Sequence, residues 1–144
     1  MKTSDVIIVG SGASGLFNAL FLPQDYKVIV ITKKEVEESD SFLAQGGISA
    51  LKNPEDYDSY FEDTMKAGHY ENDKGAVEKM IKESPQIIQD LKDFGVRFDL
   101  KDGEIEFTRE GGHSTFRILH HEDLTGKEIT SHLYEEAKKR DNIT

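Results

Sequence analysis

The chain has 144 residues, of which 36% are hydrophobic and 32% are charged, a composition typical of a globular domain with a well-solvated surface. The formal net charge of -10 argues against a nucleic-acid backbone or an anionic membrane surface as the partner. The absence of cysteine excludes disulfides, thiol nucleophiles and iron–sulfur clusters ligated by this segment. No apolar run approaches the length of a transmembrane helix, and a reducing cytoplasmic location is expected.

The first apolar stretch of the chain is followed directly by a glycine-rich turn. Residues 6–9 predict a buried strand, residues 16–22 predict a helix, and Gly-Ser-Gly-Ala-Ser-Gly at residues 10–15 joins them. In such a turn the first glycine permits the bend, the second admits a pyrophosphate close to the backbone, and the third lets the helix pack on the strand. The N-terminal end of the helix attracts the phosphates. The flanking strand and helix favour a dinucleotide-binding turn over an ordinary βα turn.

A second β-branched run, Lys27 to Thr32, predicts a parallel strand that completes a βαβ unit. This strand ends in Thr-Lys-Lys, so the acidic residue that usually binds the ribose hydroxyls is missing there. The nearby Glu35, Glu37 and Glu38 are interpreted as solvated charges of a loop. Lysine at this place suits the extra phosphate of NADP and equally suits a flavin enzyme that binds its adenosine in another way.

The following segment, residues 39–50, combines hydroxyl side chains with a second pair of glycines. Gly46 and Gly47 would let backbone N–H groups approach a flat ring system, and the Gln45 side chain offers both a donor and an acceptor. An ordinary loop that ends at a glycine is an equally good interpretation of the chemistry alone.

Three helices are predicted between residues 53 and 95. The first begins at Asn53-Pro54, since asparagine is a good cap and proline suits the first helical position. Asp73 caps the second, and Ser84-Pro85 starts a third, which Gly95 ends. The predicted buried faces hold Tyr57, Tyr60, Phe61 and Met65, then Val77, Met80 and Ile81, and finally Ile87, Ile88, Leu91 and Phe94.

The last third of the chain predicts a hairpin and a helix. Val96, Phe98 and Leu100 alternate before Asp102-Gly103, and Ile105 and Phe107 alternate after it, which indicates a β-hairpin. A capping box, Thr125 with Glu128, predicts the start of a helix that buries Ile129, Leu133 and Ala137 and ends in three basic residues. Residues 142–144 then lead towards another strand. Because two parallel strands make a poor sheet, we expect the 144 residues to be incomplete relative to their fold.

No metal site is predicted. His120 and His121 are adjacent, so on an extended segment their side chains are expected to point to opposite faces and not to share one ion. The chain also lacks an HExxH motif and a GxSxG nucleophile elbow.

Four motifs together resemble the N-terminal part of the L-aspartate oxidase family, a sister of the succinate dehydrogenase and fumarate reductase flavoproteins. They are the glycine turn, the Thr-Lys strand end, the Ala-Gln-Gly-Gly segment at residues 44–47 and Arg-Glu-Gly-Gly-His-Ser at residues 109–114. The similarity runs from Asp5 to the C-terminus and would cover only the first part of a typical member. It implies an α/β fold: a Rossmann-like FAD-binding βαβ unit with following helices and a β-hairpin. Residues 1–144 would be the N-terminal part of the FAD-binding domain, without its remainder, the capping domain and the C-terminal helical domain.

The resemblance implies a non-covalent FAD. In the family, residues matching 11–14 lie on the pyrophosphate, the position of Lys33 lies by the adenosine ribose, and the stretch matching 40–47 follows the ribityl chain and the isoalloxazine. In the respiratory relatives a histidine five residues before the glutamine attaches FAD, and Asp40 stands there in this chain. The implied cofactor-binding residues are Gly10, Ser11, Gly12, Ala13, Ser14, Gly15, Lys33, Asp40, Ser41, Phe42, Leu43, Ala44, Gln45, Gly46 and Gly47.

Glu110 is the implied substrate-recognition residue. Aspartate differs from succinate by one ammonium group, and a carboxylate near that group would favour aspartate through a charge-assisted hydrogen bond. A surface glutamate on a hairpin end is the alternative. His113 is a second candidate for the same pocket, and a structural role suits it equally well.

The resemblance implies FAD-dependent oxidation of L-aspartate to iminoaspartate, with oxygen or fumarate as the electron acceptor. This is the first step of NAD biosynthesis, which implies a functional link to quinolinate synthase. The family's catalytic arginine and histidine residues lie beyond the matched region, so we expect no catalytic residue in this chain and no turnover by it alone. The alternatives are a fumarate reductase or succinate dehydrogenase flavoprotein, which Asp40 and Glu110 disfavour, a non-catalytic FAD-binding module, and an NADP-dependent dehydrogenase.

Overall fold

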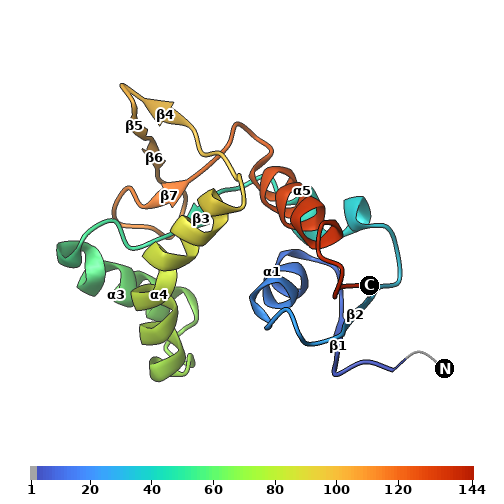
Figure 1. The fold of residues 1–144 in the computed structure, drawn as a ribbon. Coiled ribbons are helices and arrows are strands. Elements are labelled where there is room, and N and C mark those ends of the chain that lie inside the picture. The colour runs from blue at the N-terminus through green and yellow to red at the C-terminus, as the bar shows by residue number, and fades with distance from the viewer. Residues whose placement is uncertain (1–2) are drawn as a thin grey trace. The chain divides into compact units, whose positions relative to one another are not determined.

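A computed structural model describes residues 3–144, which divide into two units (Figure 1). The sheet unit comprises residues 3–46, 94–96 and 123–144, and the helical unit comprises residues 47–93 and 97–122. Within residues 3–144, no helix has the length and apolar character needed to cross a bilayer.

The sheet unit begins with the predicted βαβ motif. The chain runs from β1 (Val6–Val9) through α1 (Ala13–Phe21) to β2 (Val28–Ile31). The two strands pair in parallel, with Val6 opposite Val28 and Val9 opposite Ile31. The helix returns the chain to the end of the sheet at which β1 began, so the next strand can pair beside β1 only in the parallel direction. The α/β prediction for this region is confirmed.

Residues 142–144 add to the free edge of β2. The Val28 N–H donates to the Asn142 carbonyl (2.8 Å), the Thr144 N–H donates to the Val28 carbonyl (2.9 Å), and the Val30 N–H donates to the Thr144 carbonyl (2.8 Å). Ile143 is thereby a parallel partner of Val28. The residues that the sequence predicts to lead into a further strand therefore pair with β2 themselves, and β2 has a parallel neighbour on each side.

The core of the sheet unit is formed by α1, β2 and α5 (Thr125–Lys138), and α1 packs beside α5 (Figure 1). Its buried residues include Leu16, Leu20, Val28, Ile129, Leu133 and Ala137. Side chains on the opposite face of the strands are open to solvent, since Ile7 is 61% exposed and Val9 is 81% exposed. Within the described residues, the cover that parallel strands normally have on both faces is therefore present on one face only.

The predicted capping box of α5 is wrong by one residue. Thr125 is already helical and buried, and Leu124 occupies the cap position without a side-chain cap hydrogen bond. Glu128 instead faces the next turn, where its Oε1 lies 3.2 Å from Nε2 of His132. The N-terminal end of the helix packs closely against the segment around Ser41. A Cβ on Gly126 would collide with the carbonyl of Ser41.

The helical unit is built around two helices that lie side by side, α3 (Tyr57–Ala67) and α4 (Lys74–Asp93) (Figure 1). A short 3-10 turn, η2 (Pro54–Asp56), leads into α3. Both predicted caps are confirmed: Asn53 Oδ1 accepts from the Asp56 N–H (3.1 Å), and Asp73 Oδ1 accepts from the Ala76 N–H (2.8 Å). The buried cluster between the helices contains Tyr60, Met65, Val77 and Ile81. Met80 was predicted in this core but is 47% exposed.

The predicted break at Ser84-Pro85 is also wrong, because α4 continues through Pro85. Proline has no N–H for the carbonyl of Ile81, four residues earlier, and this loss normally ends or kinks a helix. Here the Ser84 hydroxyl donates to that carbonyl at 2.7 Å and also accepts from the Leu51 N–H at 2.8 Å. One buried hydroxyl thus satisfies the orphaned carbonyl and ties the helix to the neighbouring segment.

The strands of the helical unit are short. β4 (Leu100–Lys101) and β5 (Glu104–Ile105) form the predicted hairpin, and Asp102 and Gly103 between them both have positive φ (55° and 86°), as a type I′ turn requires. Phe107, predicted in the same hairpin, instead belongs to β6 (Phe107–Thr108). A second antiparallel sheet has the order β3 (Ile48–Ser49), β7 (Ile118–Leu119), β6.

Candidate functional site

The glycine turn after β1 has the geometry that its sequence predicts. Gly10 has φ +111°, a conformation that L side chains rarely adopt, and its N–H donates to the Ile31 carbonyl at 2.8 Å. A Cβ on Gly15 would collide with the Gly10 carbonyl, so α1 packs on the turn more closely than any other residue would permit. The turn and helix contact required of a dinucleotide-binding βαβ unit is therefore present.

The N-terminal end of α1 is left open to an anion. Gly12 occupies the cap position with extended backbone, makes no side-chain cap hydrogen bond, and precedes a first turn that contains no acidic residue. The first amides of a helix have no partners within the helix, and its dipole places partial positive charge there. Ala13, Ser14 and Gly15 supply these amides, and the arrangement suits a phosphate.

A cleft of about 560 Å³ lies against the turn, and we call it the turn cleft. Two segments separated in sequence form its walls. The first is the end of β1 with the turn, and the second is the end of β2 with the residues that follow it. The lining residues are Val9, Gly10, Ser11 and Gly12 from the first, and Ile31, Thr32, Lys33, Lys34, Glu35, Glu38, Ser39, Asp40 and Ser41 from the second. Ser11 Oγ donates to Thr32 Oγ1 at 3.0 Å, which joins the turn to the strand end. The fold thus brings together the turn, Lys33 and Asp40 around one space.

The acidic residues after β2 lie closer to this cleft than the sequence suggested. Glu35 and Glu38 are exposed, as expected, but both line the turn cleft. Lys34 Nζ lies 2.8 Å from Glu38 Oε2, and a 3-10 turn, η1 (Val36–Glu38), curls the segment back towards the strand end. The cleft therefore has carboxylates on its wall although none stands at the end of β2.

The segment from residue 40 to residue 47 divides between different surroundings. Residues Asp40–Leu43 form one helical turn, α2, whose Ser39 cap accepts from the Phe42 N–H at 3.2 Å. Asp40 and Ser41 line the turn cleft, whereas Phe42, Leu43, Ala44, Gln45 and Gly46 continue through the sheet unit beyond its walls. Gly47 belongs to the helical unit, where a Cβ would collide with the Leu119 carbonyl of β7. Close sheet packing thus requires this glycine.

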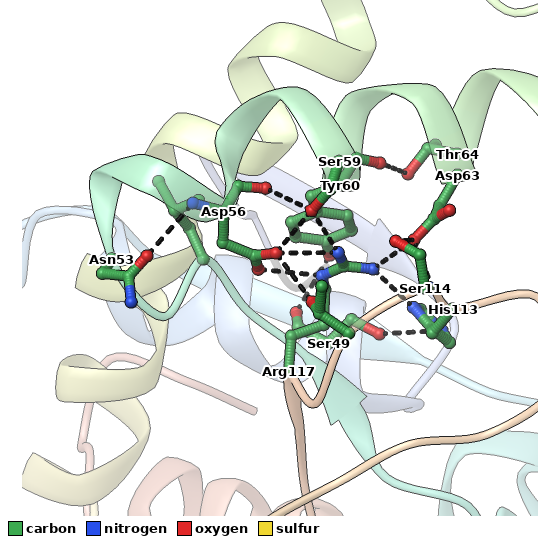
Figure 2. Close-up of polar contacts among 12 residues, drawn as sticks. Ser49, Asn53, Asp56, Ser59, Tyr60, Asp63, Thr64, His113, Ser114 and Arg117 are labelled. Atoms are coloured by element: carbon green, nitrogen blue, oxygen red, sulfur yellow. Dashed lines mark hydrogen bonds and ion pairs between the residues drawn. The ribbon is translucent and has the colours of Figure 1, made fainter.

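A buried ion network occupies the helical unit, and sequence reasoning missed it. Arg117, directly before β7, has a side chain with 0% exposure. Its Nε donates to Asp56 Oδ2 (2.9 Å), its Nη2 donates to Asp56 Oδ1 (2.8 Å), and its Nη1 donates to Asp63 Oδ2 (2.6 Å), as Figure 2 shows. The Ser59 hydroxyl accepts from Nη2 at 2.8 Å, and the Tyr60 ring lies 4.8 Å from the guanidinium carbon. We call these five residues the Arg117 cluster.

The cluster keeps both carboxylates ionised. Hydrogen bonds from Arg117, reinforced by those from Ser59 and Thr115, lower the pKa of Asp56 from its ordinary 3.8 to about 2 against the opposing effect of burial. Burial raises the pKa of Asp63, but hydrogen bonds from Ser114 and Arg117 outweigh it and hold that pKa below its ordinary value. The bonds to Asp56 likewise raise the pKa of Arg117.

A sequence signal for this cluster did exist. Asp56 and Asp63 are seven residues apart, which is two helical turns, so in the predicted helix they lie on the face that carries the apolar Tyr60. Two acids on an apolar helix face require a buried cation. The sequence did not indicate which cation, because Arg117 is more than fifty residues away along the chain.

The second predicted site, around Glu110 and His113, lies at a separate cavity of about 620 Å³ in the helical unit. Gly111, Gly112 and His113 line this His113 cavity together with Ser49, Asp63 and residues of α3 and α4. Glu110 precedes them and is exposed. The exposed Met80 also lines the cavity, which accounts for its departure from the predicted core.

His120 and His121 do not point apart as predicted. Their Nδ1 atoms lie 3.1 Å and 3.3 Å from the two carboxylate oxygens of Asp99. The reason is a turn at Glu122, which has φ 46° and donates its N–H to Asp99 Oδ2 at 2.8 Å, so the chain wraps around one carboxylate. In the part of the chain that is described, no group of three or more potential ligands is placed to hold a metal ion.

Comparison with known proteins identifies the family of this chain. The FAD binding domain family model matches residues 5–144. L-aspartate oxidase of Clostridium perfringens is 43% identical over 142 residues, covering 99% of this chain and 32% of the relative, and that of Clostridium acetobutylicum is 46% identical, covering 97% and 32%. The chain thus spans about a third of the length of these curated relatives.

Solved structures agree with these sequence matches. FrdA of E. coli quinol fumarate reductase superposes with a TM-score of 0.91 at 25% identity, covering 98% of this chain and 25% of that one. Mycobacterium smegmatis Sdh1 superposes with a TM-score of 0.86 at 29% identity, covering 99% and 27%. With its glycine turn, open helix terminus and turn cleft in place, the chain belongs to the FAD binding domain family, in the group formed by the L-aspartate oxidases and the succinate dehydrogenase and fumarate reductase flavoproteins.

Proposed function

We propose that this chain is the N-terminal, FAD-binding part of an L-aspartate oxidase, an enzyme that oxidises L-aspartate to iminoaspartate. The observation that carries the proposal is the match, over nearly the whole chain, to relatives of that name at 43% and 46% identity. The remainder of the FAD domain, the capping domain and the C-terminal helical domain, with the catalytic arginine and histidine residues, would lie outside the 144 residues.

The turn cleft fits the adenosine and pyrophosphate half of FAD. The open amides of α1 with Ser11 and Ser14 would hold the phosphates, because no side chain competes for that helix terminus. Lys33 would lie by the ribose, and Asp40 and Ser41 face the same space. Phe42 to Gly47 would follow the ribityl chain and the ring system.

The flavin would be held without a covalent bond. In the respiratory relatives a histidine five residues before the glutamine of the Ala-Gln-Gly-Gly segment attaches FAD, and here Asp40 takes that place. An aspartate carboxylate cannot form a histidyl–flavin linkage. Retention would therefore depend on the amides and side chains of the turn cleft.

When bound, FAD would supply the capacity to accept a hydride from the α-carbon of aspartate, and oxygen or fumarate would reoxidise it. The residues of this chain would bind and orient. Glu110 would recognise the substrate ammonium group through a charge-assisted hydrogen bond, and the glycines after it would allow close backbone approach. The product would enter NAD biosynthesis through quinolinate synthase.

The first experiment measures flavin binding by a protein of the relatives' length, in which this chain replaces the matching segment of the Clostridium perfringens L-aspartate oxidase, and by its Gly12→Val variant. A side chain at residue 12 would fill the space beside the pyrophosphate, and its Cβ would also lie 2.8 Å from Ser41 Oγ, so we expect the variant to lose FAD. Gly75→Ala in the first turn of α4 is the control, because nothing but Asp73 Oδ1, at 3.3 Å, approaches that position. Equal flavin content in both variants would refute the assignment of the turn.

The activity itself requires a protein of the relatives' length. We suggest replacing the matching segment of the Clostridium perfringens L-aspartate oxidase with this chain and assaying aspartate against succinate as electron donor. Aspartate oxidation with flavin that is released intact by acid is the expected result. Flavin that stays on the polypeptide would contradict non-covalent binding.

A fumarate reductase or succinate dehydrogenase flavoprotein is the second candidate, favoured by the TM-score of 0.91 with the E. coli fumarate reductase chain. In that case the hybrid protein would oxidise succinate in preference to aspartate. A third outcome, FAD binding with neither substrate oxidised, would indicate a non-catalytic FAD-binding module.

A further inference from the structure

The segment Glu110–Ser114, which we call the recognition turn, is tied down at its C-terminal end. The His113 N–H donates to the Glu110 carbonyl at 3.2 Å and closes the turn. The backbone N–H and the hydroxyl of Ser114 both donate to Asp63 Oδ2, at 2.7 Å and 2.8 Å. A single carboxylate on α3 therefore anchors a turn whose glycines and His113 line the His113 cavity.

The Asp63 carboxylate is in turn held by Arg117. Arg117 Nη1 donates to Asp63 Oδ2, and the same nitrogen lies 3.2 Å from His113 Nδ1 (Figure 2). The other two guanidinium nitrogens are occupied by Asp56 and Ser59. Because the guanidinium is rigid and planar, bonds on its three nitrogens leave it one orientation.

The contact with Arg117 decides which nitrogen of His113 carries the proton. A guanidinium can donate hydrogen bonds but cannot accept them, so Nδ1 of His113 must be the unprotonated acceptor. The proton of the neutral ring then sits on Nε2, which lies 3.4 Å from Ser49 Oγ. His113 thus presents a neutral N–H donor, and Ser49 a hydroxyl, at the wall of the cavity.

We propose that Arg117 is a positioning residue: through Asp63 it anchors the recognition turn, and through Nδ1 it holds His113 in its Nε2–H tautomer. The consequence for the proposed aspartate oxidation rests on that function. There Arg117 would keep Glu110 and His113 in position for the substrate without lining the cavity itself. Arg117 itself is fully buried and is not part of the cavity wall, so its hold on Asp63 does not depend on the ligand.

The proposed tautomer of His113 is tested by NMR on this 144-residue chain with ¹⁵N-labelled histidine, since long-range ¹H–¹⁵N couplings distinguish the two tautomers. His113→Gln identifies the signal. We expect His113 as the Nε2–H tautomer, and loss of that preference in Arg117→Lys, whose ammonium cannot bond Asp56, Asp63 and His113 together. An Nδ1–H tautomer in the unmodified chain would overturn the proposal.

Ser49→Ala shows whether Arg117 or Ser49 sets the tautomer of His113, even if Arg117→Lys fails to fold. It removes the acceptor for Nε2–H and leaves Arg117 intact. If Arg117 sets the tautomer, Nε2–H persists in this variant. If the ring switches to Nδ1–H, Ser49 controls it and Arg117 does not.

The anchoring half is tested with Asp63→Asn, which weakens the hold on Ser114 but keeps the contact from Arg117 to His113. We expect hydrogen exchange of the Ser114 amide to accelerate about tenfold or more while the tautomer is unchanged. In the hybrid oxidase, KM for L-aspartate should rise about tenfold with kcat altered less than about twofold. Unchanged exchange would overturn the anchoring role. A hybrid that oxidises no aspartate before mutation would count against the proposed function and leave the NMR result standing.

Discussion

The two units of this protein form their sites in opposite ways. In the sheet unit the site is made of backbone: a glycine bend, the open amides of α1 and a strand end. In the helical unit the site depends on side chains, since the recognition turn is held by a buried arginine and two carboxylates from distant segments. A backbone site depends on a few adjacent residues, whereas a side-chain site depends on the whole tertiary fold.

The difference also affects stability. The glycine turn buries no charged side chain. Its formation requires only that no side chain occupies the space at its glycines. The Arg117 cluster removes ions from water, and such a network is stable only while every partner is present. Damage to one member should therefore cost more in the helical unit than a comparable change in the sheet unit.

The largest effect is expected from Arg117→Met. Removal of the cation leaves Asp56 and Asp63 buried without their partner, which should lower the free energy of unfolding by about 3–5 kcal/mol. Urea denaturation followed by circular dichroism measures it. Lys79→Met, which breaks an exposed pair with Glu83 on α4, is the control and should have no measurable effect. Similar losses in both variants would show that the burial of the network is unimportant.

The pH dependence of stability should follow the same cluster. The pKa of Asp56 is lowered to about 2 in the folded chain, so its stabilising effect is complete above its ordinary value of 3.8 and is lost as the pH falls towards 2. The lowered pKa of Asp63 acts in the same direction. We expect the stability difference between the unmodified chain and Asp56→Asn to shrink as the pH falls from 5 to about 2. A constant difference would mean that the carboxylate is not ionically paired.

Gly15→Val tests the sheet unit with a purely steric change. Its Cβ would meet the Gly10 carbonyl, a backbone atom that cannot move aside, and overpacking of this kind costs about 1–3 kcal/mol. Thermal unfolding compared with Gly75→Ala provides the measurement. An unchanged midpoint would mean that the turn can open without loss.

Ser84→Ala should destabilise the helical unit by about 1–2 kcal/mol, because it leaves the Ile81 carbonyl and the Leu51 N–H without their shared partner. A compensating variant makes the test specific. With Pro85→Ala the backbone N–H of residue 85 becomes available to the Ile81 carbonyl, so Ser84→Ala should cost less in that background. Equal cost in both backgrounds would remove the proposed role of the hydroxyl.

The smallest effect on stability is expected from Glu110→Gln, since Glu110 is exposed. In the hybrid oxidase this change should nevertheless lower aspartate oxidation about tenfold through loss of one charge-assisted bond to the ammonium group. Fumarate reduction, whose substrate has no ammonium group, should fall less. Equal losses in both reactions would remove the recognition role.

Much of the sheet unit could be predicted because its signals are local. Two β-branched runs, a glycine turn and the apolar spacing of α5 each lie within a few residues, and each corresponds to one element. The errors were also local competitions: Pro85 predicted a helix break that the Ser84 hydroxyl prevents, and Thr125 predicted a cap that close packing moved to Leu124. In the first case a neighbouring hydroxyl overrode the propensity of the backbone, and in the second case packing against the distant Ser41 did so.

The sequence by itself determined the βαβ unit, the glycine turn and the family, because backbone conformation and short motifs are encoded by neighbouring residues. Only the tertiary structure decided that Arg117 would join Asp56 and Asp63, that Glu35 would line the turn cleft, and that two adjacent histidines would share Asp99. Their partners come from segments that sequence proximity cannot pair. Burial then makes those pairings necessary, since a charge removed from water must find an opposite charge wherever the fold provides one.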